Sequence, residues 1–227
     1  MKKHLLAALF ILFNIHALPA QDTALLGKVK TALQKTWPNN RAINLVFHGH
    51  SVPAGYFATP AVHTLDAYPQ QVLRGLKEKY PNAVINVIVT AIGGENSLKG
   101  AERFAGDVLV HKPDVLFIDY ALNDRALGTE KARAAWEQMI REAQAKNIPV
   151  ILLTPSPDIS TDWKAAGNPL RRHRDQIVAL SKQYHTGLVD TYGIFLQQPD
   201  VKPLMAQSNH PNEKGHRLIA EGILHWF

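Results

Sequence analysis

The hydrophobic pattern of the chain alternates between short apolar runs and longer amphipathic segments. The short runs are rich in Val, Ile, Leu and Phe and are nearly continuous in apolar character, which is typical of strands buried on both faces of a sheet. They cover residues 42–47, 83–90, 114–120, 149–154 and 187–190. The pattern therefore predicts five strands.

Between these runs, apolar residues recur at the spacing of an amphipathic α-helix. The spacing predicts helices around residues 72–80, 132–143 and 177–184. A last helix is predicted to start near Pro211, because proline suits the first turn of a helix. The buried face of this last helix is predicted to contain Leu218, Ile219, Ile223 and Trp226. Strands that alternate with helices indicate an α/β fold in which a parallel sheet lies between two helical layers.

The N-terminal segment has the pattern of a secretory signal peptide. Lys2 and Lys3 give a basic start, residues 5–15 are apolar, and a small residue ends the segment. The apolar run is shorter than the roughly 20 residues that a bilayer span requires. We therefore expect residues 1–20 to be removed on export and residues 21–227 to form a single domain, in the periplasm or outside the cell.

Composition narrows the function classes. The 227 residues include 25 Lys and Arg, 19 Asp and Glu, and no Cys. Loss of the signal peptide would remove Lys2 and Lys3 and leave 23 basic against 19 acidic residues, a net charge of +4. This charge is too mild to indicate nucleic-acid binding, and the lack of cysteine excludes disulfides, thiolate zinc sites and a cysteine nucleophile. We expect no nucleic-acid partner and no membrane span after signal removal, and the sequence predicts no oligomeric state.

Residues with distinctive chemistry follow the predicted strands. In parallel α/β sheets, ligands bind beyond the carboxyl ends of the strands, where the loops converge. Ser51 follows the first strand, Gly94 the second and Asn123 the third, and His210 precedes the last helix. A hydroxyl, an imidazole and neutral hydrogen-bond donors are the groups that acyl transfer requires. Each residue alone is typical of a turn or a cap, so it is the set that predicts a site.

These residues occur in the order typical of the SGNH/GDSL hydrolase family, which the chain resembles. The resemblance runs from the Gly49-His50-Ser51 block to the His210-Pro211-Asn212 block. The Gly-x-Ser-x-Gly elbow of α/β-hydrolases is absent, because Pro53 occupies its second glycine position. The resemblance implies a three-layer α/β/α sandwich with a five-stranded, flavodoxin-like parallel sheet, and no cofactor or metal. It implies that Ser51 is the nucleophile and His210 the general base. The implied oxyanion hole consists of the backbone N–H groups of Ser51 and Gly94 and the side-chain amide of Asn123.

Three positions depart from the family pattern. His50 stands where the family's Gly-Asp-Ser block has its aspartate, and Ala121 stands where the third block usually has glycine. Gln207 lies three residues before the histidine, where the family usually has the aspartate that orients the imidazole. Glutamine supplies no negative charge to stabilise the imidazolium. The imidazole is therefore oriented by Gln207, by a backbone carbonyl nearby, or by a carboxylate from another loop, such as Asp158 or Asp190.

Other histidines suggest two further hypotheses. His210, Glu213 and His216 are spaced three apart, but metal-binding helices usually place their histidines four apart, so this spacing is poor for zinc. His48 and His50 lie next to the predicted nucleophile. They either change the pH dependence of the reaction or only shape the turn.

The predicted function is that of an exported serine esterase that hydrolyses carboxylic esters through an acyl-enzyme. We expect it to remove acetyl or other small acyl groups from carbohydrate, because no long apolar lid segment follows Ser51. Hydrolysis of lipid esters or thioesters by a member of the same family is one alternative. A non-catalytic carbohydrate-binding protein on the same fold is another.

Overall fold

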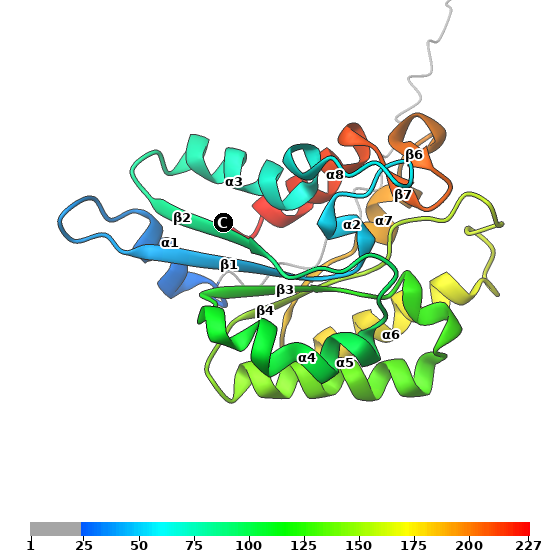
Figure 1. The fold of residues 1–227 in the computed structure, drawn as a ribbon, viewed down its shortest axis with the longest axis horizontal. Coiled ribbons are helices and arrows are strands. Elements are labelled where there is room, and N and C mark those ends of the chain that lie inside the picture. The colour runs from blue at the N-terminus through cyan, green and yellow to red at the C-terminus, as the bar shows by residue number, and fades with distance from the viewer. Residues whose placement is uncertain (1–23) are drawn as a thin grey trace, which may run out of the picture.

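A five-stranded parallel sheet lies between two layers of helices in the computed structural model, which describes residues 24–227 (Figure 1). The strand order is β2-β1-β3-β4-β5, and every neighbouring pair is parallel. The strands are β1 (Ala42–Gly49), β2 (Val84–Val89), β3 (Val115–Asp119), β4 (Val150–Leu153) and β5 (Gly187–Val189). The predicted fold class and the five predicted strands are confirmed. The predicted signal peptide lies outside the described residues.

Helices cover both faces of the sheet. One face carries α3 (Tyr68–Lys79) and α8 (Glu213–Leu224), and the other carries α4 (Ser97–Asp107), α5 (Thr129–Gln144) and α6 (Pro169–Tyr184) (Figure 1). Shorter helices are α1 (Gly27–Leu33), α2 (Ser51–Ala54) and α7 (Thr191–Leu196). Single 3-10 turns are η1 (Thr64–Asp66), η2 (Leu109–His111), η3 (Asn123–Ala126) and η4 (Lys202–Leu204).

The central strands contribute side chains to two separate hydrophobic layers. Phe47 and Phe117 lie in the layer that includes α3 and α8, and their rings stack with centroids 4.3 Å apart. Val46 and Ile118 lie in the layer that includes α4 and α5. Because successive side chains of a strand point to opposite faces, a strand buried on both faces must be apolar throughout. This explains the continuous apolar runs in the sequence.

The structure differs from the predicted elements at several places. Pro211 does not begin the last helix, because it belongs to β7 (His210–Pro211), which pairs antiparallel with β6 (Met205–Gln207). The helix begins at Glu213 because the side chain of Asn212 accepts hydrogen bonds from two backbone N–H groups of the first turn. The sequence did not predict α1, α4 and α7, which are short or contain glycine. The residues of β2 are half-buried or exposed, because this strand forms an edge of the sheet.

The strand order brings the loops with distinctive chemistry together. β1 lies between β2 and β3, so the carboxyl ends of β1 and β3 are adjacent, and the chain leaves them toward opposite faces. Such a switch point is where open α/β sheets bind their ligands. Ser51 follows β1 and Asn123 follows β3. Among residues 24–227, no helix combines the length and apolar character needed to cross a bilayer.

Candidate active site

Ser51 lies in a sharp turn from strand to helix. β1 ends at Gly49, His50 is the N-cap of α2, and Ser51 is the first residue of that helix. The first backbone N–H groups of a helix have no partner within the helix. The Ser51 N–H therefore has no hydrogen-bond partner within α2.

The hydroxyl of Ser51 lies within hydrogen-bond distance of an imidazole. Ser51 Oγ and His210 Nε2 are 2.8 Å apart. The two residues are 6% and 5% exposed, so the contact is shielded from water. Figure 1 shows α2 beside the hairpin of β6 and β7 that carries His210. Burial lowers the pKa of His210, with a smaller opposing effect from its hydrogen bond to the Phe57 carbonyl. The imidazole is therefore neutral at pH 7 and able to accept a proton.

Two groups contact the other nitrogen of this imidazole. Nδ1 of His210 lies 3.0 Å from the backbone oxygen of Phe57 and 2.6 Å from Nε2 of Gln207. The two carboxylates that the sequence suggested for orienting His210 have other partners. Asp158 pairs with Arg125 at 2.8 Å, and Asp190 pairs with Arg174 at 2.5 Å. The imidazole is contacted by a backbone carbonyl and an amide rather than by a carboxylate.

These two contacts favour opposite tautomers of His210. A proton on Nδ1 can be donated to the Phe57 carbonyl, which leaves Nε2 free to accept the Ser51 proton. A proton on Nε2 would leave Nδ1 to accept a hydrogen bond from the Gln207 amide. Gln207 is held in place because its oxygen accepts the Thr59 N–H at 2.9 Å and its nitrogen donates to Asn209 at 3.0 Å. Only the first tautomer gives a general base for the serine hydroxyl.

Two further hydrogen-bond donors belong to the loops after β2 and β3. Gly94 is exposed and has a φ of +79°, and a Cβ added there would meet no atom within 4 Å. Asn123 is half-buried, and its Nδ2 donates one hydrogen bond to the backbone oxygen of Glu95 at 2.9 Å. A primary amide has two N–H groups, so the second stays available to a ligand.

His50 caps the short helix α2 at the position where the family's Gly-Asp-Ser block has its aspartate. Its Nδ1 accepts the Val52 N–H at 3.1 Å, so the proton of the neutral ring is on Nε2. That atom lies 3.3 Å from Oδ1 of Asp119, as an electrostatic contact rather than an aligned hydrogen bond. Asp119 is 5% exposed and also accepts a hydrogen bond from the Tyr68 hydroxyl at 3.1 Å. His50 therefore shapes the turn that carries the serine, as one of the two sequence hypotheses stated.

The remaining histidines do not take part in the contact with Ser51. His48 is buried between the sheet and α4, and burial lowers its pKa to about 4. His216 is fully buried, its Nδ1 accepts the Tyr68 N–H, and burial lowers its pKa to about 3. Glu213 instead pairs with Arg217 at 3.0 Å. Over residues 24–227, no group of three or more His, Asp or Glu side chains is placed to hold a metal ion.

Several groups at the site were not identified from the sequence. The Phe57 carbonyl has no side-chain signature, so only the fold could reveal it. Asp119 had a signal that could have been used, because it is a charged residue at the end of a strand that is otherwise apolar. Glu95 and Arg103 lie beside the loop that carries Gly94, and their ion pair joins residues eight apart across the start of α4.

The sequence signature of the GDSL-like lipase/acylhydrolase family matches residues 47–218, which is more than half of the chain. The uncharacterized lipoprotein YqeF of Bacillus subtilis (strain 168) is 29% identical over 175 residues, which cover 61% of this chain and 72% of that protein.

Solved structures share the fold. An acetylxylan esterase from Geobacillus stearothermophilus superposes with a TM-score of 0.69 at 21% identity, covering 81% of this chain and 93% of that one. A two-domain esterase active on acetylated mannans, co-crystallized with mannopentaose, gives a TM-score of 0.72 at 21% identity, covering 90% of this chain and 53% of that one. From the family signature and the fold, the chain belongs to the GDSL-like lipase/acylhydrolase family and is an ester-hydrolysing enzyme.

Proposed function

We propose that Ser51 is the nucleophile of this esterase and that His210 is its general base. The single observation that carries the proposal is the distance of 2.8 Å between Ser51 Oγ and His210 Nε2. As Oγ attacks the ester carbonyl, its proton passes to Nε2. The same proton then passes to the leaving alcohol, and the acyl group stays on Oγ. Water, deprotonated by the same imidazole, hydrolyses this acyl-enzyme and restores the serine.

The oxyanion of each tetrahedral intermediate is bound by neutral donors in this proposal. The donors are the backbone N–H groups of Ser51 and Gly94 and the second N–H of the Asn123 amide. The helix-start position of Ser51 and the exposed position of Gly94 support these roles. Removing one such donor from a serine hydrolase lowers kcat by about 10²- to 10³-fold.

In the proposed mechanism, the Phe57 carbonyl keeps His210 in the active tautomer. It accepts the Nδ1–H and leaves Nε2 to take the proton of the serine. The support is the distance of 3.0 Å between Nδ1 and this carbonyl. A carbonyl carries only a partial negative charge, so it stabilises the imidazolium less than a carboxylate does. Gln207 adds a second polar contact without adding charge.

The proposed substrate is a carbohydrate that carries acetyl or another small acyl group. Two structures of the same fold are described as esterases of acetylated xylan and acetylated mannan. Tyr56 is half-buried, its ring centroid is 6.3 Å from that of His210, and its ring lies against Gly93. It offers an aromatic surface for a sugar ring beside the nucleophile. Trp163 lies in a polar loop after β4, but it is only 5% exposed and packs against Tyr192, so it offers no such surface.

The enzyme is proposed to act outside the cytoplasm, in the periplasm or the surrounding medium. The pattern of residues 1–20 supports export. A relative described as a lipoprotein also supports it. Separating periplasm from culture medium and probing each fraction for the protein would test this proposal.

The first experiment compares hydrolysis of p-nitrophenyl acetate and p-nitrophenyl palmitate by the purified protein, Ser51→Ala and His210→Ala. We expect the acetyl ester to be preferred and both variants to lose at least about 10³-fold in kcat while remaining folded. Wild-type turnover in either variant would contradict the catalytic roles. Preference for palmitate would favour the lipid-ester alternative, and binding of acetylated xylan without any turnover would favour the carbohydrate-binding alternative.

A further inference from the structure

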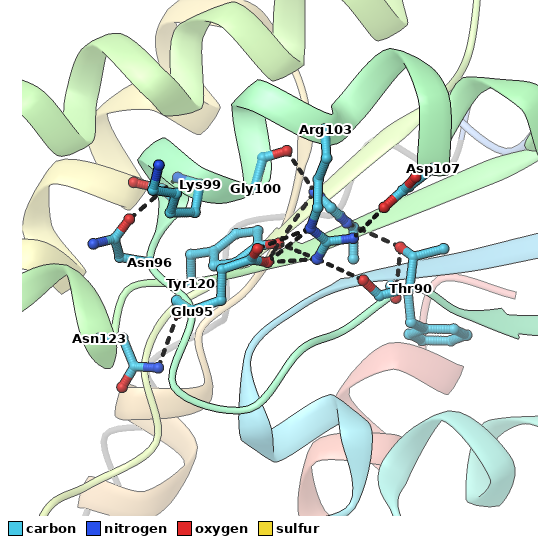
Figure 2. A network of polar contacts seen from close by, with 12 residues as sticks. Thr90, Glu95, Asn96, Lys99, Gly100, Arg103, Asp107, Tyr120 and Asn123 are labelled. Carbon is cyan, nitrogen blue, oxygen red and sulfur yellow. Dashed lines mark hydrogen bonds and ion pairs between the residues drawn. The ribbon is translucent and has the colours of Figure 1, made fainter.

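A network of charged and hydroxyl groups lies behind the loop that carries Gly94 (Figure 2). Its centre is the carboxylate of Glu95, whose side chain is 9% exposed. Arg103, on α4, donates from Nε to both carboxylate oxygens at 2.9 and 3.0 Å, and from Nη2 at 2.5 Å. The hydroxyl of Tyr120, just after β3, donates to the same carboxylate at 2.8 Å. The carboxylate therefore joins the loop after β2, the helix α4 and the end of β3.

Arg103 holds this loop at both of its ends. Its Nη2 donates to the backbone oxygen of Thr90 at 2.7 Å, directly after β2. The same guanidinium binds Glu95, which directly follows Gly94. Gly94 is exposed and has no side chain, so no side-chain packing fixes its position. The position of its N–H is then set by the contacts of its neighbours.

The second proposed oxyanion donor is attached to the same network. Asn123 donates to the backbone oxygen of Glu95 at 2.9 Å, and Figure 2 shows its amide pointing toward that loop. The backbone N–H of Asn123 also donates to the backbone oxygen of Tyr120 at 3.0 Å. Glu95 and Tyr120 therefore connect the amide of Asn123 to the loop of Gly94.

We propose that Glu95 and Arg103 are positioning residues that fix the Gly94 N–H relative to the Asn123 amide. This inference rests on the proposed function, because it gives these two donors a catalytic role. A buried ion pair adds little net stability compared with apolar residues of the same shape. Donors that stabilise an oxyanion, in contrast, must be held in place before the reaction. The network meets that requirement for two donors from different loops.

Three groups that contact Glu95 or Tyr120 keep one charge state near neutral pH: Arg103, Tyr120 and His48. Burial opposes the charge of Arg103, but its hydrogen bonds to Glu95 raise the pKa of Arg103 above the usual range. Burial raises the pKa of Tyr120, so its hydroxyl stays protonated. His48 lies 3.1 Å from the Tyr120 hydroxyl and has a pKa of about 4, so it remains neutral. Asp107, the other carboxylate that faces Arg103, lies 3.2 Å from Nη1.

The test is the kinetics of Glu95→Gln on p-nitrophenyl acetate. Glutamine keeps the size of the side chain and the backbone oxygen that binds Asn123, but it removes the charge that binds Arg103. We expect kcat to fall by about 10- to 100-fold, because small misplacements of catalytic groups have effects of this size. KM should change little by comparison, and labelling by a fluorophosphonate should slow with kcat.

Glu102→Gln is the matched control. Glu102 lies on the same helix, and its carboxylate pairs with Lys99 at 2.8 Å with both side chains more than half exposed. This variant loses the same charge away from the loop and should keep wild-type kcat. If Glu95→Gln fails to fold, Arg103→Lys replaces it, because lysine keeps the charge but cannot reach Thr90 and both carboxylate oxygens at once.

Combining Glu95→Gln with Asn123→Ala separates a positioning role of Glu95 from a general structural role. If Glu95 acts through the oxyanion hole, the double variant should be much less impaired than the product of the two single losses. Wild-type kcat in Glu95→Gln, or losses that multiply in the double variant, would overturn the inference. If Ser51→Ala is inactive while Glu95→Gln equals the wild type, this inference alone fails. Wild-type turnover in Ser51→Ala would instead overturn the proposed function.

Discussion

Gln207 is the residue that most distinguishes this site from the family pattern that the sequence resembles. Its amide lies 2.6 Å from Nδ1 of His210, where a carboxylate would add a full negative charge. Without that charge, burial dominates and lowers the pKa of His210. A general base is active in its neutral form, which predominates above its pKa. The acidic limb of the kcat/KM profile should therefore have its midpoint below the ordinary histidine value of about 6.5.

Gln207→Glu should move this acidic limb to higher pH. Glutamate has the same shape, can still accept the Thr59 N–H, and adds a negative charge beside the imidazolium. Such a charge raises a neighbouring histidine pKa by about 1 to 3 units. The added stabilisation of the imidazolium should also raise kcat above that limb, by about tenfold. The measurement is kcat/KM for p-nitrophenyl acetate from pH 4.5 to 9.

Gln207→Ala is the companion variant, because it removes the side-chain contacts without adding charge. It should weaken the attachment of the β6–β7 hairpin, which carries His210, to the backbone of Thr59. It should leave the midpoint of the acidic limb near that of the wild type. An unchanged midpoint in Gln207→Glu would mean that the limb does not report His210.

At the scale of elements, the start of α8 fixes the loop that carries His210. The side chain of Asn212 accepts the N–H groups of Lys214 and Gly215 at 3.0 and 3.2 Å. Its Nδ2 also donates to the backbone oxygen of Pro203 at 2.9 Å. Asn212 lies two residues after His210. Its side chain therefore both caps α8 and attaches the start of this helix to the segment before β6.

Asn212→Ala should lower the free energy of unfolding by about 1 to 2 kcal/mol, through loss of the helix cap. Asn212→Ser keeps an acceptor for the helix N–H groups but cannot reach Pro203, so it should recover part of this loss. Urea unfolding of the wild type and the two variants measures their free energies of unfolding. We expect the highest value for the wild type, an intermediate value for Asn212→Ser and the lowest for Asn212→Ala. Equal stability of the alanine variant and the wild type would show that the cap contributes nothing.

At the scale of the whole molecule, buried neutral histidines couple stability to pH. Burial lowers the pKa to about 4 for His48 and His173 and to about 3 for His216. The unfolded chain binds protons near pH 6.5, while the folded chain does not until much lower pH. Above pH 6.5 these histidines are neutral in both the folded and the unfolded chain. The free energy of unfolding therefore falls only as the pH drops below that value.

His173→Leu should reduce the loss of stability between pH 7.5 and pH 4.5 by about 2 kcal/mol, because it removes one of these groups. His173 is 2% exposed on α6, and leucine fits a buried helix position. The measurement is urea unfolding at the two pH values. The same pH dependence in the variant and the wild type would mean that His173 is not kept neutral by the fold.

The sequence by itself determined the strand pattern, the α/β class and the residues of the proposed site. It did so because side chains that alternate between two buried layers leave continuous apolar runs, and because the loops after such strands converge at one edge. It also placed Gln207 beside the imidazole, since the two residues lie only three positions apart in a short hairpin.

The tertiary structure alone decided what those residues contact. The Phe57 carbonyl lies 153 positions from His210 in sequence and has no side-chain signal. Asp119 reaches His50 because β1 and β3 are neighbours in the sheet. Arg103 and Glu95 meet because α4 turns back across the end of β2. Periodicity reports which face of an element is buried, whereas contacts between polar groups depend on the packing of distant elements, which only the folded chain specifies.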